Sequence, residues 1–187
     1  MKRKMFLLTT CTFFIYLSNI SYAQPPENLQ KLYQFKGLWN VEAALTYIGE
    51  PTITGKGYQY CNIVAKGWGL QCVSRLESEE ADIIYDEGVM IGHDAASDLI
   101  NWSVFNSFGE ALTLTGKFTE PDTLKLEKIE ELKAGILKTD TVICHFEDEN
   151  TLTLVNDISV DGEIVTQYRV RMVKQGNYGG ESGKKNK

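Results

Sequence analysis

From Trp39 to Lys174 the chain is a series of short runs in which apolar and polar residues alternate, and each run is closed by turn residues. Such alternation is typical of half-buried β-strands, and Asp161-Gly162 is a strong signal for a two-residue hairpin. Ten runs follow one another: 39–48, 52–64, 68–76, 84–93, 99–106, 111–118, 123–132, 136–146, 151–160 and 163–174. The sequence therefore predicts an all-β protein in which tight turns join consecutive antiparallel strands.

Ten strands joined in this way leave few means of protecting the two edges of the sheet. An unpaired edge invites aggregation, and pairing the first strand with the last removes it. We therefore expect an up-and-down antiparallel β-barrel of about ten strands. A β-sandwich is the alternative, but it needs longer connections between sheets, and only 77–83 is of that kind.

A short N-terminal helix is predicted before the first strand. Leu29, Leu32 and Phe35 recur at roughly helical spacing, and Gly37 suits the end of a helix. Trp39 follows at once, and we expect its large side chain to form the floor of the barrel.

Alternation also gives each strand an inner face. Side chains nearly fill an eight-stranded barrel, whereas a ten-stranded barrel is wider and has room for a cavity. The residues predicted to line such a cavity are apolar or aromatic: Val41, Leu45, Tyr47, Trp102, Leu154, Tyr168, Val170 and Met172. Asn156 shares the inner face of its strand with Leu154. This lining suits a small hydrophobic molecule, unless the side chains meet in the middle and leave no space.

Residues 1–23 are typical of a secretory signal peptide. Three basic residues precede the uncharged run 5–17, and Ser21-Tyr22-Ala23 offers a cleavage site with small residues at its first and last positions. An uncleaved anchor is the alternative, but the run is shorter than the roughly 20 residues that span a bilayer. Cys11 raises a lipoprotein alternative. We expect export to the periplasm or the exterior, and no membrane insertion after cleavage.

The remaining chain is predicted to comprise one barrel domain, 24–174, and a disordered tail, 175–187, which is rich in glycine and has no apolar pattern. Loss of the signal peptide lowers the number of basic residues from 19 to 16, against 25 acidic residues, so the net charge becomes −9. An acidic protein repels phosphate backbones, which argues against nucleic-acid binding. The sequence does not indicate whether the protein is a monomer or an oligomer.

Three cysteines remain after cleavage, and two of them flank a turn. If Val64 pairs with Gly69, Cys61 lies opposite Cys72. An exported protein meets oxidising conditions, so we expect a structural disulfide between these two cysteines. Cys144 is then left as a buried thiol.

The segment Gly37-Leu38-Trp39, which follows a short helix and opens the first strand, resembles the Gly-x-Trp start of the calycins, the lipocalins and fatty-acid-binding proteins. Residues 90–94, 115–118 and 124–126 look like an uncharacterised family of secreted bacterial lipocalin-like barrels, and the resemblance covers about 32–173. It implies the fold, and ligand binding only by analogy. In lipocalins an arginine near the end of the final strand covers the tryptophan, a role that the resemblance gives here to Arg169 or Arg171.

No pattern in the sequence indicates catalysis or a cofactor. His93 and His145 are the only histidines, and although nitrobindin-like barrels bind haem through one histidine, their glycine-rich stretch after the tryptophan is absent, so no cofactor is expected. No cluster offers the three or four ligands of a zinc site. The acids Glu87 and Asp94 lie near predicted strand ends and are interpreted as solvated turn residues. Gly55-Lys56-Gly57 lacks the helix that follows a phosphate loop and is interpreted as a bend or bulge.

The predicted function is therefore an exported calycin-like barrel, non-enzymatic, that binds a small hydrophobic molecule inside. Two alternatives stay open. One is an isomerase or cyclase that acts on an apolar substrate in the same cavity, and the other is a protein-interaction module with a filled barrel.

Overall fold

The computed structural model describes residues 24–175. The predicted signal peptide and 176–187 of the predicted tail lie outside the described residues. The helical elements are α2 (Glu27–Lys31) and the single 3-10 turns η1 (Leu32–Phe35), η2 (Ala65–Gly67) and η3 (Lys133–Gly135). The strands are β1 (Gly37–Tyr47), β2 (Ile53–Val64), β3 (Gly69–Ser78), β4 (Ile83–Asp94), β5 (Leu99–Asn106), β6 (Ala111–Glu120), β7 (Thr123–Glu131), β8 (Leu137–Asp148), β9 (Thr151–Val160) and β10 (Glu163–Lys174).

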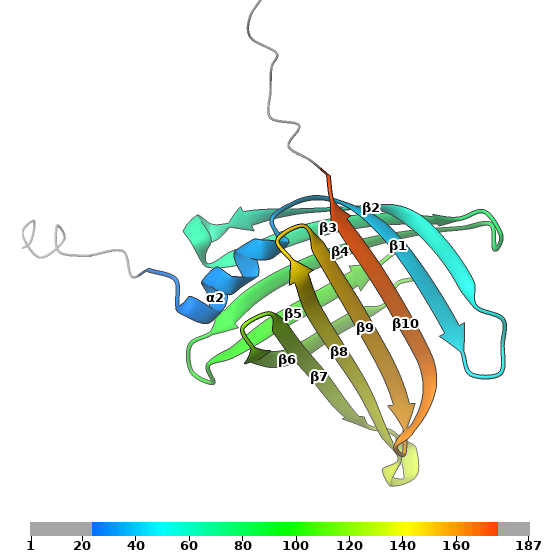
Figure 1. Cartoon of the computed structure of the whole chain (residues 1–187). Coiled ribbons are helices and arrows are strands. Elements are labelled where there is room, and N and C mark those ends of the chain that lie inside the picture. Colours follow the sequence, from blue (N-terminus) through cyan, green and yellow to red (C-terminus); the bar gives the residue numbers. More distant parts are fainter. Residues whose placement is uncertain (1–23, 176–187) are drawn as a thin grey trace, which may run out of the picture.

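The strands form a closed antiparallel barrel in which each strand pairs with its neighbours in sequence (Figure 1). The closing ladder joins β1 to β10 and runs from the pair Trp39 and Lys174 to the pair Tyr47 and Thr166. The predicted ten-stranded barrel with a short N-terminal helix is confirmed, and the sandwich alternative is wrong. Closure leaves neither β1 nor β10 with an unpaired edge.

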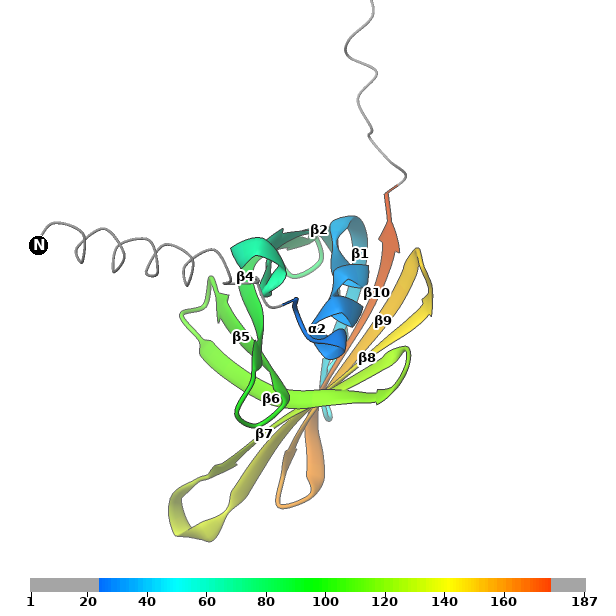
Figure 2. The same ribbon diagram turned by 90° about the vertical axis from the view of Figure 1, so that its left-hand side faces the viewer.

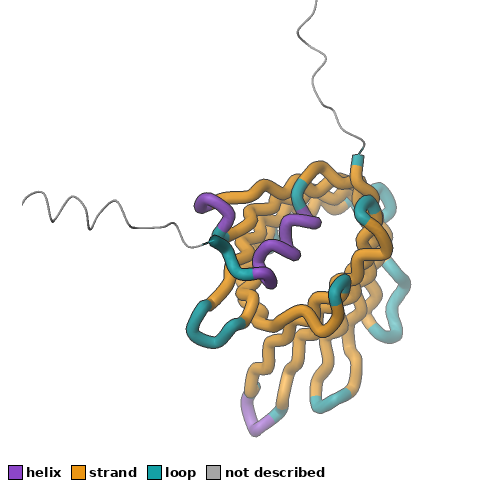
Figure 3. The backbone as a smooth tube through the Cα atoms, turned by 60° about the vertical axis from the view of Figure 1, so that its left-hand side comes forward, coloured by secondary structure: helices purple, strands orange, loops and turns teal. Residues whose placement is uncertain are grey.

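The short helical segment lies inside the ring of strands at one end and closes it (Figures 2 and 3). Its apolar side chains Leu29, Leu32 and Phe35 are fully buried. The Phe35 ring meets two inward aromatics edge-on, Trp102 at 5.5 Å and Phe146 at 4.8 Å between ring centroids. Edge-to-face packing of this kind adds stability beyond that of simple burial. The buried side chains of the helical segment thus fill this end of the barrel, and we call the segment the plug.

Trp39 sits directly against the plug. It is fully buried, and its indole Nε1 donates a hydrogen bond of 2.7 Å to the carbonyl of Phe35. The indole therefore satisfies its own polar group and also the last turn of the helical segment. As expected, Trp39 forms the floor of the barrel.

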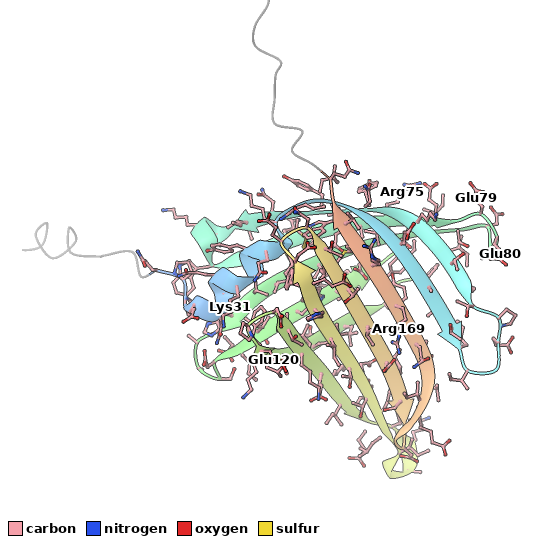
Figure 4. The ribbon with its side chains drawn as sticks, viewed as in Figure 1. Lys31, Arg75, Glu79, Glu80, Glu120 and Arg169 are labelled. Atoms are coloured by element: carbon pink, nitrogen blue, oxygen red, sulfur yellow. A yellow bond between two sulfur atoms is a disulfide. The ribbon has the colours of Figure 1, made fainter. Side chains whose placement is uncertain are left out.

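The cation over this indole is a lysine, which corrects the expectation that Arg169 or Arg171 covers it. Nζ of Lys174 lies 4.9 Å from the centroid of the Trp39 ring. Arg169 instead donates from Nη1 to Asp157 at 2.7 Å, and Arg171 is exposed (Figure 4 labels Arg169). Both arginines have odd numbers on β10, and the inward residues of that strand, such as Val170 and Met172, have even ones.

The register of the β2–β3 hairpin agrees with the one that the sequence suggests. Val64 pairs with Gly69 and Cys61 with Cys72, and the two sulfur atoms are bonded at 2.06 Å. Cys144 is a buried free thiol, and desolvation raises its pKa to about 12. A thiol in that state is a poor nucleophile.

Candidate functional site

The half of the barrel away from the plug contains a cavity of about 590 Å³. This volume is within the range of sites that hold drug-sized molecules, roughly 300 to 1,000 Å³. Its walls come from seven strands, β1 to β5, β9 and β10, and from the turn between β5 and β6. The lining residues are Ala43, Leu45, Tyr47, Ile53, Thr54, Gly55, Leu76, Glu77, Ser78, Ile83, Tyr85, Asn106, Phe108, Glu110, Asn156, Ile158, Thr166 and Tyr168.

The cavity opens to solvent at one end, and the exposure of the inward side chains along β1 shows which end this is. Trp39 has no exposed surface and Tyr47 is 49% exposed, with Val41, Ala43 and Leu45 between them. Side chains are fully enclosed at the start of the strand and open to solvent at its end. The barrel is therefore filled at the plugged end and hollow at the other.

The predicted lining residues lie at two depths. Leu45, Tyr47 and Tyr168 line the cavity itself. Tyr168 also borders a second, smaller void of about 40 Å³, and the other members of the predicted set line only that void: Val41, Trp102, Leu154, Val170 and Met172. All eight predicted residues thus point into the barrel, but only three of them line the large cavity, and the other five lie deeper, around the small void.

Among residues 24–175, no side chain of a lysine, arginine or histidine lines the cavity. Two glutamates belong to the lining. Glu77 has its carboxylate on the outer face, 3.0 Å from Nε of Arg75, so the backbone of Glu77 is what borders the space. Glu110 lies at the mouth and accepts a hydrogen bond of 2.7 Å from Nδ2 of Asn106.

Beneath the cavity lies a polar pair that the sequence did not identify. The Tyr85 hydroxyl donates a 2.6 Å hydrogen bond to Glu87 Oε2. Glu87 borders the small void, whereas Tyr85 and Tyr168 border both spaces. Glu87 lies two residues before the buried Val89 on β4, so its side chain also points into the barrel. Its interpretation as a solvated turn residue is therefore wrong.

The interior changes the acidity of these groups. Desolvation raises the pKa of Glu87, and the hydrogen bond from Tyr85 offsets part of this rise. Desolvation likewise raises the pKa of both Tyr85 and Tyr168, and the nearby Glu87 carboxylate adds to it. The tyrosines therefore stay protonated, and ionisation of Glu87 costs free energy in the folded state.

Asn156 supplies a further polar atom at the inner end of the cavity. It pairs with Tyr168 across β9 and β10 and lines the cavity. Its Oδ1 is buried and accepts no hydrogen bond from any residue that the structure describes. A buried carbonyl oxygen without a partner costs free energy in the folded state.

The two histidines lie apart from the cavity. His93 Nε2 is 2.8 Å from Asp98 Oδ1, near the turn between β4 and β5. His145 projects outward, with its Nδ1 3.1 Å from the Thr123 hydroxyl, while its neighbour Cys144 points inward. Within 24–175, no group of His, Cys, Asp and Glu is arranged to hold a metal ion. None of the helices in the same range is long and apolar enough to cross a membrane.

We predict that Glu87→Gln increases thermal stability at neutral and alkaline pH. Because the folded state raises the pKa of Glu87, the cost of its ionisation is absent at low pH and appears as the pH rises through that raised pKa. The increase in Tm should therefore be small near pH 4 and grow with pH, as followed by circular dichroism. The exposed Glu131→Gln serves as the control. An equal Tm change at all pH values would contradict the assigned cause.

Solved structures of similar shape include two barrels that match most of this chain. One is the S-type phycobiliprotein lyase CPES from Guillardia theta, with a TM-score of 0.57 and 9% identity, over 80% of this chain and 94% of the lyase. The other is Rv2717c from M. tuberculosis, with a TM-score of 0.57 and 12% identity, over 82% of this chain and all of that one. Both are ten-stranded barrels of calycin-like fold, and at these identities the likeness concerns the fold alone. Scans against protein-family models and curated proteins give no match.

Proposed function

We propose that this protein is an exported carrier that binds a small, mostly apolar molecule in the open half of its barrel. The observation that carries the proposal is the cavity of about 590 Å³, which opens to solvent at one end and is lined mainly by apolar and aromatic side chains. Ligand sites combine such a lining with a few convergent polar groups. Tyr85, Tyr168 and Asn156 supply those groups here.

Export is part of this proposal and rests on the sequence of residues 1–23. The disulfide between Cys61 and Cys72 supports it, because such bonds persist in oxidising compartments. The likeness to a phycobiliprotein lyase is one of fold and selects no ligand.

An isomerase or cyclase is the second candidate, and the Tyr85–Glu87 pair is the observation in its favour. A carboxyl group with a raised pKa near a cavity is a common feature of acid-base sites. However, Glu87 borders only the small void, and the tyrosines lie between it and the larger cavity. A molecule in the cavity therefore meets hydroxyl groups before it meets the carboxyl group, which favours binding over catalysis.

The interaction-module alternative assumed a solid interior. The open half of the barrel contains a cavity of about 590 Å³, so its interior is not solid. Among the three hypotheses, small-molecule binding therefore has the strongest support.

Ala43→Trp is expected to abolish binding of a neutral apolar fluorophore, N-phenyl-1-naphthylamine. Ala43 lines the cavity, and an indole at this position would occupy much of the space. The matched control is Ala44→Trp, because the next residue of β1 points to the opposite face. Fluorescence enhancement is measured for the wild type and both variants. Equal enhancement in all three, or none in the wild type, would overturn the proposed function.

A further inference from the structure

We infer that the ligand carries a neutral carbonyl group, as in a ketone, an aldehyde or an ester, at the end of its apolar body that enters the cavity first, and that Asn156 and Tyr168 donate hydrogen bonds to its oxygen. The inference rests on the proposed function and specifies its ligand class. It follows from the donors that remain at the inner end of the cavity and from the charges around it.

Two polar side chains that border the cavity already bond to other parts of the protein. The Tyr85 hydroxyl donates to Oε2 of Glu87 at 2.6 Å, and the side chain of Asn106 interacts with the same hydroxyl. Nδ2 of Asn106 also donates to Glu110 at 2.7 Å. These four residues form a chain of interactions from the mouth to the floor of the cavity, so the donors for a ligand have to come from elsewhere.

Asn156 provides the first of these donors. Its side chain lines the cavity, and its Oδ1 is enclosed, whereas its Nδ2 retains accessible surface. This nitrogen donates no hydrogen bond to any residue within 24–175. Because an amide nitrogen only donates, a bound molecule has to offer it an acceptor.

Tyr168 provides the second donor. It borders both the cavity and the small void beneath, and its hydroxyl makes no hydrogen bond with a described residue. Desolvation raises the pKa of this hydroxyl, so it keeps its hydrogen at neutral pH. A hydroxyl hydrogen turns to suit its partner, so Tyr168 is able to donate to the same atom as Asn156.

The two donors belong to paired residues on neighbouring strands. Asn156 of β9 lies opposite Tyr168 of β10, and the Cβ atoms of such a pair are about 4.5 to 5.5 Å apart. A carbonyl oxygen has two lone pairs and brings no hydrogen of its own. One carbonyl group therefore accepts from both side chains at once, whereas an ammonium group would set its hydrogens against theirs.

The charges around the cavity favour a neutral carbonyl group over a carboxylate. Among residues 24–175, no cationic side chain lines the space, and the carboxyl groups of Glu87 and Glu110 lie beneath it and at its mouth. A carboxylate that entered would lose its hydration and gain no counter-charge, which costs free energy. A ketone or an ester avoids this cost.

The test compares three probes that share an alkyl chain and differ at its end: undecan-2-one, its hydrocarbon isostere 2-methylundec-1-ene, and decanoate. Each is titrated at pH 7.5, below the concentration at which it forms micelles, and its affinity is measured by displacement of N-phenyl-1-naphthylamine. We expect undecan-2-one to bind at least about 5-fold more tightly than the alkene and at least about 10-fold more tightly than decanoate.

The outcomes separate this inference from the proposed function. If the fluorophore binds the wild type but the alkene or decanoate displaces it as well as the ketone does, the inference is overturned and the proposed function stands. The same holds if none of the three probes displaces it. If the wild type does not bind the fluorophore, both are overturned.

Two variants then test the named donors. Tyr168→Phe and Asn156→Leu nearly preserve side-chain size, and each should weaken binding of undecan-2-one by about 5- to 10-fold while the affinity for the alkene changes by less than about 2-fold. The matched controls are Tyr60→Phe and Asn62→Leu, at exposed residues on the outer wall of β2. Enhancement of N-phenyl-1-naphthylamine fluorescence shows that each variant retains its cavity. Unchanged ketone binding in both cavity variants, or an equal loss for the alkene, would overturn the assignment of these donors.

Discussion

Trp39→Ala is expected to lower the free energy of unfolding by about 3 to 5 kcal/mol, the usual cost of deleting a large buried aromatic side chain. The indole is fully enclosed, and its removal would leave a space between the helical plug and the strands. It would also leave the Phe35 carbonyl without its 2.7 Å donor and Lys174 without the ring beneath its ammonium group.

Urea denaturation followed by circular dichroism measures this change. The control is Trp68→Ala, which removes an indole that is 40% exposed in the wild type, and a smaller loss is expected. If both variants lost the same stability, or if Trp39→Ala unfolded at the urea concentration of the wild type, Trp39 would not be the floor of the core.

Gly57→Ala is expected to cost at least the upper end of the roughly 1 to 3 kcal/mol that overpacking costs, and to prevent folding if the strand does not yield. A β-carbon at position 57 would lie 1.8 Å from the backbone oxygen of Arg75 and 3.0 Å from the α-carbon of Leu76. The obstacle is backbone in the paired strand β3, so a side-chain rotation does not relieve it.

The matched control is Gly88→Ala in β4. A β-carbon there would meet nothing within 4 Å, and alanine lowers the entropy of the unfolded chain. We expect Gly88→Ala to leave the midpoint of urea denaturation unchanged or slightly higher. Similar midpoints for Gly57→Ala and the wild type would show that β2 and β3 have room to separate at this point.

Local sequence patterns determine most of the fold. The alternation of apolar and polar residues gives each strand its inner face, and closely spaced turns allow only neighbouring strands to pair, so closure between β1 and β10 is the remaining step. The register across the turn between β2 and β3, from Val64 and Gly69 to Cys61 and Cys72, also follows from local spacing. The bend or bulge expected at Gly55-Lys56-Gly57 is wrong, because the β1–β2 and β2–β3 ladders run past Gly57 without a bulge. A glycine is needed at position 57 because the backbone of β3 lies too close for a β-carbon.

The candidate site was less predictable because it depends on how far the plug reaches into the barrel. Alternation tells which residues point inward but not which of them meet side chains from the opposite wall. Trp102 was expected in the cavity and instead packs on Phe35 of the plug. Glu87 was interpreted from its charge, although the parity that it shares with Val89 and Ile91 places it inside.

The replacement of the expected arginine by Lys174 has a similar origin. The inward parity of β10 is even, which excludes Arg169 and Arg171 once the register is known. Lys174 pairs with Trp39 across the closing ladder, and its long side chain folds back over the ring. Knowledge of which residue of β10 faces Trp39 would have identified it.

Closure by the plug also fixes the direction in which the two ends of the described chain leave the barrel. Residue 24 precedes the helical segment, and Gln175 follows β10 and bonds through its backbone amide to Leu38 at the start of β1. Both ends thus emerge on the sealed side, opposite the entrance near Tyr47. A surface tether joined to the barrel at residue 24 or at Gln175 would therefore start on the side away from that entrance.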